Sequence, residues 1–320
     1  MRKHANSPEG RFPDPRTFGI VQTTTSPLEG KTTIELEIHR HHFERCDSTN
    51  ESAIEWLKTA SSGDIGIFTT DHQLSGKGQR GARWEHGKGL DLAWTLAINW
   101  EPDTSAKLAL HANVWFALNK AIALATLQTI DDALKPAASP TRIKWPNDLY
   151  VQSGKIWEKC GGILIENAWK GQHISGSVIG IGINALSSDL PRYRTSLSQV
   201  APNIKADQFD PRILGKSLEK NIRLAIEEWK VACTFSSSAA AAYHQKMSKL
   251  FDACLLAKGI WKSYRWKNEA KVGKIAAVDG SGRCIMEWKK TEDSGSLQSI
   301  ENNKQLQWSW IYDQLDAEAN

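Results

Sequence analysis

Two apolar stretches separated by a short polar segment constrain the fold of this chain more than any other feature. They are CGGILIENAWK, residues 160–170, and HISGSVIGIGINA, residues 173–185. Each is long, rich in isoleucine and glycine, and lacks the three- and four-residue spacing of a helix. We therefore expect an antiparallel hairpin with its turn near residues 169–172, and a chain built around a β-sheet.

The remaining segments add strands and helices to that hairpin. Alternating or apolar runs predict strands at residues 32–46, 65–73 and 90–100, and a strand over 141–151 that stops at Pro146. Helical spacing follows DSTN at 47–50 and recurs over 108–134, 213–230 and 239–251. The fold class is therefore α+β, with a central mixed, largely antiparallel sheet flanked by helices.

The two ends of the chain differ from its middle. Residues 1–31 lack periodicity and predict a loosely ordered arm. Residues 32–255 form the predicted main domain. Residues 256–320 predict a small all-β domain, a β-barrel of four or five short strands, in which VDGSGRC marks a hairpin turn.

Composition excludes several classes of protein. The chain has 320 residues, 40% of them hydrophobic, and a formal net charge of +4. No apolar run reaches the roughly 18 residues of a membrane span, and the charge is too low to predict a nucleic-acid binder. The five scattered cysteines lack a CxxC pair, which indicates reduced thiols, no structural zinc and a cytoplasmic location.

A glycine-rich basic run, GKGQRGARW at residues 76–84, is the first candidate binding element. It follows a predicted strand but lacks the GKS or GKT ending of a P-loop. Its glycines free backbone N–H groups, and Lys77, Arg80 and Arg83 add positive charge. An anion-binding loop that closes on a carboxylate or phosphate fits these residues, and so does a solvated surface loop.

KWPNDLY at residues 144–150 is the second candidate element. Lys144 ends an apolar strand before a rigid Trp-Pro pair, so it either projects into a cleft or lies on the surface. Asn147 and Asp148 can orient a ribose or a phosphate-bound magnesium ion. The paired glycines of KCGGILIE mark either a close approach of a flat ligand or a bulge. Asn184, at a strand end, either reads a ligand or caps a turn.

Taken in order, DSTN, Gln73 with GKGQRGARW, KWPNDLY, KCGGILIE and IGIGIN resemble the biotin protein ligase family over about residues 40–200. The resemblance implies a class II synthetase-like core, and a monofunctional member without the N-terminal DNA-binding domain, since fewer than 50 residues precede DSTN. It also implies two reactions. Biotin and Mg²⁺-bound ATP give biotinyl-5′-AMP, and a lysine of a carboxylase carrier domain, such as that of acetyl-CoA carboxylase, then accepts the biotin.

The resemblance also assigns residues to ligands. Catalysis is expected from Lys144, which would bridge the carboxylate and the α-phosphate, and from Arg80. The biotin-binding residues are expected to be Ser48, Thr49, Asn50, Gln73, Gly76, Lys77, Gly78, Gln79, Trp84, Lys144 and Gly162. The ATP-binding residues are expected to be Lys77, Arg80, Arg83, Trp84, Asn147 and Asn184. Magnesium ligands are not identified.

The run at 76–84 departs from the familiar pattern GRGRRGRxW at three positions. Lys77, Gln79 and Ala82 stand where that pattern has arginine. Lys77 keeps a charge without the guanidinium fork, and Ala82 removes a cation. Two other readings remain: a non-catalytic biotin-binding or sensing relative, and a lipoate or octanoate transferase of the same fold. A homodimer is possible, and neither DNA nor membrane is an expected partner.

Overall fold

The computed structural model describes residues 38–85, 87–100, 112–171, 173–266, 269–289, 297–300 and 306–307. The predicted N-terminal arm, residues 1–31, lies outside these ranges, as does the beginning of the strand predicted from residue 32.

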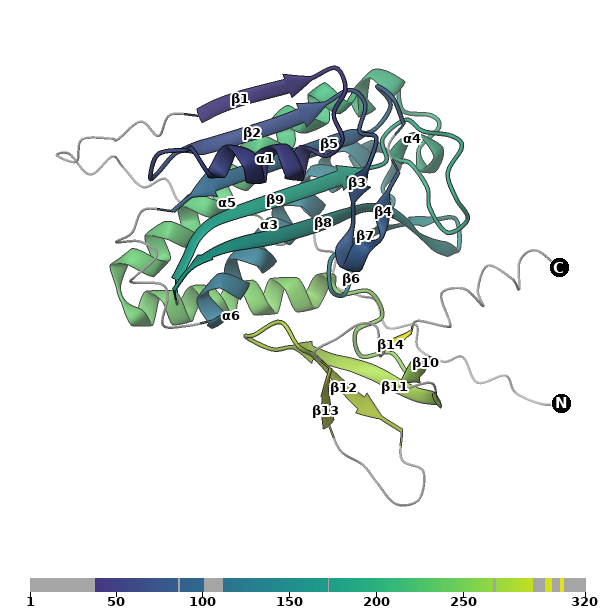
Figure 1. The fold of residues 1–320 in the computed structure, drawn as a ribbon. Helices are drawn as coiled ribbons and strands as arrows, with labels where there is room; N and C mark the ends of the chain where they lie inside the picture. The colour runs from purple at the N-terminus through teal and green to yellow at the C-terminus, as the bar shows by residue number, and fades with distance from the viewer. Residues whose placement is uncertain are drawn as a thin grey trace, which may run out of the picture. The chain divides into compact units, whose positions relative to one another are not determined.

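Seven strands form the main sheet, shown in Figure 1. In spatial order they are β1 (Ile38–Phe43), β2 (Ile65–Thr70), β5 (Leu92–Asn99), β9 (His173–Ile183), β8 (Ile156–Lys170), β7 (Asp148–Ser153) and β6 (Thr141–Lys144). The β1–β2 pair is parallel and every other neighbouring pair is antiparallel. The predicted mixed, largely antiparallel sheet is thus confirmed.

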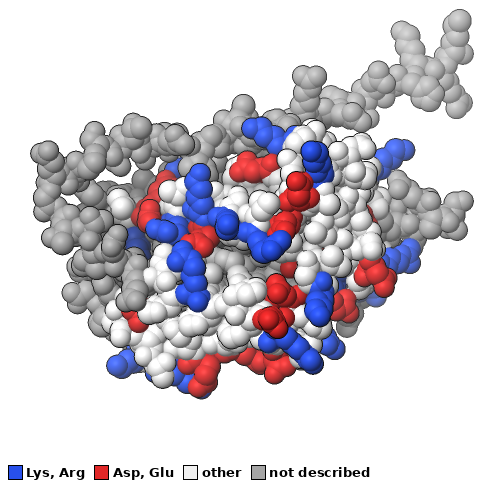
Figure 2. Space-filling model, turned by 90° about the horizontal axis from the view of Figure 1, so that it is seen from above, with Lys and Arg blue, Asp and Glu red and all other residues white. Residues whose placement is uncertain are grey.

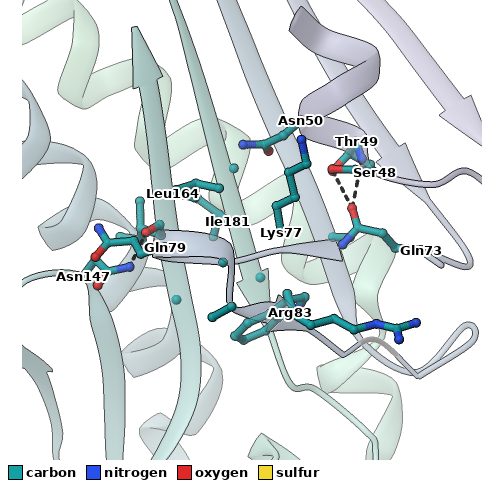
Figure 3. Close-up of a pocket in the computed structure, with 18 of the residues that line it drawn as sticks. Ser48, Thr49, Asn50, Gln73, Lys77, Gln79, Arg83, Asn147, Leu164 and Ile181 are labelled. Atoms are coloured by element: carbon teal, nitrogen blue, oxygen red, sulfur yellow. Dashed lines mark hydrogen bonds between the residues drawn. The ribbon is translucent and has the colours of Figure 1, made fainter. Parts of the chain in front are cut away.

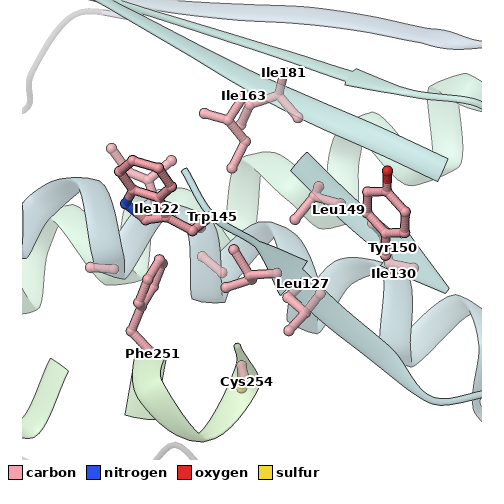
Figure 4. Close-up of a cluster of buried hydrophobic side chains, with 14 of the residues drawn as sticks. Ile122, Leu127, Ile130, Trp145, Leu149, Tyr150, Ile163, Ile181, Phe251 and Cys254 are labelled. Atoms are coloured by element: carbon pink, nitrogen blue, oxygen red, sulfur yellow. The ribbon is translucent and has the colours of Figure 1, made fainter. Parts of the chain in front are cut away.

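Helices cover both faces of this sheet. The short helix α1 (Thr49–Leu57) packs on β2, β5 and β9, where Phe68, Ala97 and Val178 alternate toward it. The opposite face packs against three long helices, α3 (Ala112–Leu134), α5 (Pro211–Phe235) and α6 (Ser237–Cys254) (Figure 1). Their apolar faces meet the sheet in one continuous core, part of which is drawn in Figure 4. Successive side chains of a strand point to opposite faces of the sheet, so one face packs on the short helix α1 and the other on the three long helices.

The hairpin predicted from the two apolar stretches is confirmed. Strands β8 and β9 pair from Gly161↔Ile183 to Lys170↔His173, so the two strands stay paired up to the predicted turn. Strand β8 extends past its other neighbour, because β7 pairs only with residues 156–162 of it.

A second sheet lies near the C-terminus. Its strands are β10 (Lys262–Trp266), β11 (Glu269–Val278), β12 (Cys284–Trp288), β13 (Leu297–Ile300) and β14 (Leu306–Gln307), in the order β13–β12–β11–β10–β14. The predicted VDGSGRC turn joins β11 to β12. The predicted closed barrel is not confirmed, because within the described ranges β13 and β14 are the two edges of an open sheet.

A buried lysine joins the β11–β12 turn to the helices. Lys120 of α3 is fully buried, and its ammonium nitrogen donates to Ser248 Oγ on α6 at 2.9 Å. It also donates to the carbonyl oxygens of Val278 and Asp279, at 3.1 and 3.2 Å. These three acceptors match the three donors of an ammonium group, so the buried charge is fully hydrogen-bonded.

Three further features concern the charges on the surface, the apolar character of the helices and the state of the cysteines. Lys and Arg side chains are mixed with Asp and Glu over the described face shown in Figure 2, and several Lys and Arg side chains adjoin one another on its left half. None of the helices within the described ranges combines the length and apolar character needed to cross a membrane. All five cysteines are free thiols.

Candidate functional site

A pocket of about 220 Å³ opens over β5, β8 and β9, between the start of α1 and the glycine-rich segment (Figure 3). Many residues predicted for biotin line it: Ser48, Thr49, Asn50, Gln73, Lys77, Gly78, Gln79, Trp84 and Gly162. Two residues predicted for ATP, Arg83 and Asn147, line it as well. Segments distant in the sequence therefore converge on one cavity.

One end of the pocket is built from neutral hydrogen-bonding groups. The carbonyl oxygen of the Gln73 side chain accepts from the backbone N–H of Thr49 at 2.9 Å and from its hydroxyl at 3.2 Å. The Thr95 hydroxyl lies 2.8 Å from both Thr49 Oγ1 and Asn50 Oδ1. Asn50 Nδ2 donates to the Glu166 carboxylate at 3.0 Å. This network fixes the side chains at the start of α1.

The glycine-rich run is a small hairpin rather than an irregular loop. Strand β3 (Gly76–Lys77) pairs with β4 (Arg83–Trp84) around the single-turn 3₁₀ helix Gln79–Gly81. Gly78 N donates to Ala82 O at 2.7 Å, and Gly81 has a φ of 78°, which favours glycine. We call residues 76–84 the lid hairpin.

The cations of the lid hairpin have separate partners. Lys77 Nζ lies 2.6 Å from Glu51 on α1, and this contact raises the pKa of Lys77. Figure 3 shows Lys77 directed toward Asn50. Arg83 instead points away from the cavity and donates to Leu74 O at 2.6 Å. The side chain of Arg80 lies outside what the structure describes.

Trp84 forms a wall of the pocket. The sequence allowed a close approach of another group to the glycines, and that group is the indole ring of Trp84. A Cβ on Gly182 would lie 2.6 Å from Cζ2 and 2.7 Å from Nε1 of Trp84, and one on Gly162 would lie 3.4 Å from Cζ3. The ring thus lies directly on the two glycines. Its Nε1 is buried and has no hydrogen-bond partner among the described residues.

The other end of the pocket is charged. Lys159 Nζ lies 2.6 Å from Asp148 Oδ1 and 5.5 Å from the centre of the Trp84 ring. Both Lys159 and Asp148 line the pocket. Lys159 belongs to the quoted KCGGILIE motif, directly before Cys160 and the paired glycines, but the sequence analysis assigned it no role.

Lys144 does not line the cavity. Its side chain is 15% exposed, lies 3.8 Å from Asp148 Oδ2, and sits 5.5 Å from the ring centre of Tyr150. Burial lowers the pKa of Lys144 and the nearby Lys159 cation lowers it further, while Asp148 acts in the opposite direction. Lys144 and Lys159 therefore share the Asp148 carboxylate, which lines the pocket.

Two further predicted residues support the pocket without lining it. Gly76 lies against Gln73 and Trp84, where a side chain would displace both. Asn184 is buried, and its side-chain Nδ2 donates to Thr195 O at 3.1 Å. The backbone carbonyl oxygen of Asn184 accepts from Leu197 N at 3.0 Å. Asn147 lines the pocket and donates to Ile163 O at 2.6 Å.

Two polar lining residues have no sequence motif that points to them. Thr95 lies within the buried strand β5, and Arg194 follows β9 in an irregular segment. No group of three or more His, Cys, Asp or Glu side chains that could hold a metal ion occurs in the part of the chain that the structure describes.

Comparisons with known proteins agree with this geometry. Residues 42–184 match the model of the Biotin/lipoate A/B protein ligase family. The chain is 26% identical over 204 residues to the bifunctional ligase/repressor BirA of Escherichia coli, covering 64% of this chain and 56% of that protein. It is 34% identical over 140 residues to the biotin–[acetyl-CoA-carboxylase] ligase of Paracoccus denitrificans, covering 44% and 52%. The chain thus spans about half the length of these curated relatives.

Solved structures share the fold. The apo structure of biotin protein ligase from Aquifex aeolicus aligns with a TM-score of 0.57 at 18% identity, covering 84% of this chain and 98% of that one. The R40G mutant of that protein, solved in complex with biotin, aligns with a TM-score of 0.55 at 19% identity, covering 84% and 97%. At this identity the alignments describe the architecture alone.

Proposed function

We infer that this chain, whose residues 42–184 form a domain of the Biotin/lipoate A/B protein ligase family, is an ATP-dependent biotin–protein ligase. It joins biotin to ATP as biotinyl-5′-AMP and releases pyrophosphate. A lysine amine of a carrier domain then attacks the mixed anhydride, which forms the amide and releases AMP. The observation that carries this proposal is the chemical asymmetry of the pocket. The neutral hydroxyl and amide groups of Thr49, Asn50 and Gln73 lie at one end, beside Lys77, and Lys159 with Asp148 lies at the other.

The neutral end suits the ureido ring of biotin. A ureido group offers two N–H donors and one carbonyl acceptor, and has no charge. Ser48, Thr49, Asn50 and Gln73 supply hydroxyl and amide groups, which can both donate and accept. Glu166 holds the amide of Asn50, so the orientation of that amide is set before a ligand arrives. Trp84 provides the apolar wall beside this array.

The charged end suits the reacting groups. The biotin carboxylate must approach the α-phosphate of Mg²⁺-bound ATP, and two anions repel each other unless positive charge lies between them. We propose that Lys159 provides that charge, because its ammonium lines the pocket beside Trp84. Lys144 shares Asp148 with it and helps to set its position. Alignment of the two substrates supplies further acceleration.

The lid hairpin shields the product of the first step. An acyl-adenylate is hydrolysed when water reaches it, so a segment that covers the pocket preserves it for the acceptor lysine. Lys77, Gly78 and Gln79 line the pocket from this hairpin. Of the predicted phosphate-side residues, Arg80 remains a proposal, and Asn147 can approach the nucleotide from the turn before β7.

The remaining parts of the proposal concern organisation and partners. Residues 32–255 form the catalytic domain, 256–320 a small all-β domain, and 1–31 an arm. The acceptor is the biotin carrier domain of a carboxylase such as acetyl-CoA carboxylase, as the name of the Paracoccus denitrificans relative states for that protein. Magnesium arrives with ATP. The enzyme acts in the cytoplasm, without DNA or membrane, and a homodimer is tested by sedimentation.

Biotin-dependent ATP–pyrophosphate exchange tests the first step. The wild-type chain is assayed with biotin, with lipoate, with octanoate and with no acid, beside Lys159→Gln. Lys58→Gln is the matched control, because the side chain of Lys58 is 63% exposed at the end of α1 and outside the pocket. Exchange that requires biotin, collapses in Lys159→Gln and persists in Lys58→Gln supports the proposal.

The other outcomes identify the alternatives. Biotin binding by calorimetry without exchange indicates a non-catalytic binding protein. Exchange with lipoate or octanoate alone places the chain in another branch of the family. Mass spectrometry of a carrier domain, which gains one biotinyl group on its acceptor lysine, tests the second step.

A further inference from the structure

Among the described residues, four that carry a positive charge line the pocket, and each has an acceptor. Lys77 contacts Glu51, Arg83 contacts Leu74 O, and Lys159 contacts Asp148. The fourth, Arg194, lies outside every motif considered above. Its Nη1 is 3.2 Å from Glu85 Oε2, and its side chain is 26% exposed.

The backbone that carries Arg194 is tied to the charged end of the pocket. Lys159 N donates to Tyr193 O and Thr195 N donates to Lys159 O, both at 3.0 Å. These bonds bracket Arg194 and place its Cα opposite that of Lys159 in a short parallel bridge. The side-chain amide of Asn184 holds the Thr195 carbonyl from the other side. Arg194 therefore starts from a fixed backbone beside Lys159, although the segment has no regular secondary structure.

The contact with Glu85 is easily exchanged. Glu85 is 56% exposed and directly follows β4, so water and salt screen the pair. A phosphate group offers several anionic oxygens, and a guanidinium can donate to two of them at once. A polyphosphate entering the pocket therefore presents Arg194 with a better acceptor than the carboxylate at the rim.

The lid hairpin has no positive charge at position 82. Position 82 of the lid hairpin, where the sequence pattern has arginine, is Ala82, and both Ala82 and Arg194 line the same pocket. A positive charge removed from the lid hairpin can thus be supplied from the segment that follows β9.

We propose that Arg194 binds the phosphate groups of the nucleotide, exchanging Glu85 for phosphate oxygens, and supplies the positive charge that Ala82 does not. This deepens the proposed function and rests on it for the identity of the nucleotide as a substrate. The ligand chemistry is that of a polyphosphate, so inorganic pyrophosphate is itself a probe of the site.

The experiment compares Arg194→Gln with Glu85→Gln. Both variants remove the same ion pair, but only the first removes the cation. Calorimetry gives the Kd of pyrophosphate, and biotin-dependent exchange gives the KM for ATP. Arg194→Gln should weaken both about tenfold, which corresponds to about 1.4 kcal/mol. Glu85→Gln should leave both unchanged or tighten them, because Arg194 then has no competing carboxylate. The Kd for biotin should be the same in all three proteins.

Equal weakening in the two variants would overturn the proposal, because Arg194 would then act only by tying Glu85 and the lid hairpin to the rest of the site. Unchanged phosphate binding in Arg194→Gln would overturn it as well. If Arg194→Gln folds poorly, Arg194→Lys keeps a charge without the fork and should bind pyrophosphate with intermediate strength. Wild-type protein that binds pyrophosphate through Arg194 but shows no biotin-dependent exchange would refute the proposed function and leave this inference standing.

Discussion

Replacing Gly182 with alanine tests whether Trp84 is the wall of the pocket. Gly182 lies on β9, and its φ does not require glycine, so the only obstacle to a side chain is space. An added Cβ would lie 2.6 Å from Cζ2 and 2.7 Å from Nε1 of Trp84. Carbon atoms prefer separations of about 3.5–4.0 Å, so the indole must move by about 1 Å. An indole that moves toward the cavity would narrow the pocket that it lines.

The cost follows from known over-packing effects. Inserting a methyl group into a tightly packed region costs about 1–3 kcal/mol. If that cost is taken from the bound state, the Kd for biotin rises by about 5- to 150-fold. If the fold absorbs it instead, the free energy of unfolding falls by the same amount. The two losses together should therefore reach this range.

Calorimetric titration with biotin measures the change in Kd, and unfolding by urea measures the change in the free energy of unfolding. Gly176→Ala is the matched control, since it lies on the same strand and its Cβ would meet the flexible end of Leu57 at 3.2 Å and Ile98 O at 3.4 Å. We expect Gly176→Ala to bind biotin normally. A Gly182→Ala protein with wild-type affinity and wild-type stability would refute the placement of Trp84 on the glycines.

Three further predictions follow from the site and its supports. Lys159→Gln should lower kcat for biotin-dependent exchange by about 10²–10³-fold, as for the loss of one group that stabilises developing charge, whereas Lys144→Gln should lower it about tenfold or less; equal losses would contradict the assignment. Asn184→Ala removes the donor to the buried Thr195 carbonyl and should cost about 1–3 kcal/mol in the free energy of unfolding, measured with urea. Asp210 begins α5, and its bonds with Arg212 lower its pKa from 3.8 to about 2. Because the folded-state pKa is depressed, its stabilisation is present above about pH 4 and is lost as the pH falls toward 2. Asp210→Ala should therefore cost about 1 kcal/mol at pH 7, and its thermal unfolding curve should converge with that of the wild type near pH 2.

Local patterns were sufficient for most of the main sheet. The β8–β9 hairpin, the helix after DSTN and the turn between β11 and β12 depend on periodicity and turn residues that lie close together in the sequence. The order of the strands, in contrast, depends on pairings between segments far apart. The closed C-terminal barrel was expected from composition alone, and composition does not specify which edge strands pair.

The two lysines of the charged end show where sequence reasoning stops. Lys144 and Lys159 are both near Asp148, and spacing alone does not show which of them faces the cavity. The β7–β8 pairing shifts register between Leu149 and Tyr150, so Tyr150 pairs with Lys159 while Leu149 pairs with Gly161. An irregularity of this kind changes the face on which later side chains lie. It falls at Cys160, beside the paired glycines for which the sequence allowed either a bulge or a close approach, without deciding between them.

The strand pairing of the lid hairpin could not be predicted from the sequence for a related reason. Glycine-rich basic residues are typical of irregular loops, and the pairing of Gly76 with Trp84 depends on a site into which both fit. Gly76 lies against Gln73, and Trp84 lies on glycines from another part of the chain. Tertiary contacts therefore order a segment whose own residues do not favour order.

The buried Lys120 has a consequence for attempts to shorten the protein. Expression of residues 36–255 alone would delete Val278 and Asp279, and with them two of the three acceptors of its ammonium group. A charged group that stays buried without partners is far more costly than the lost contacts themselves. The shortened fragment would have to open around α3 to hydrate the lysine. Any minimal version of this protein must therefore keep the β11–β12 turn, or replace Lys120 with an apolar residue of similar length such as methionine.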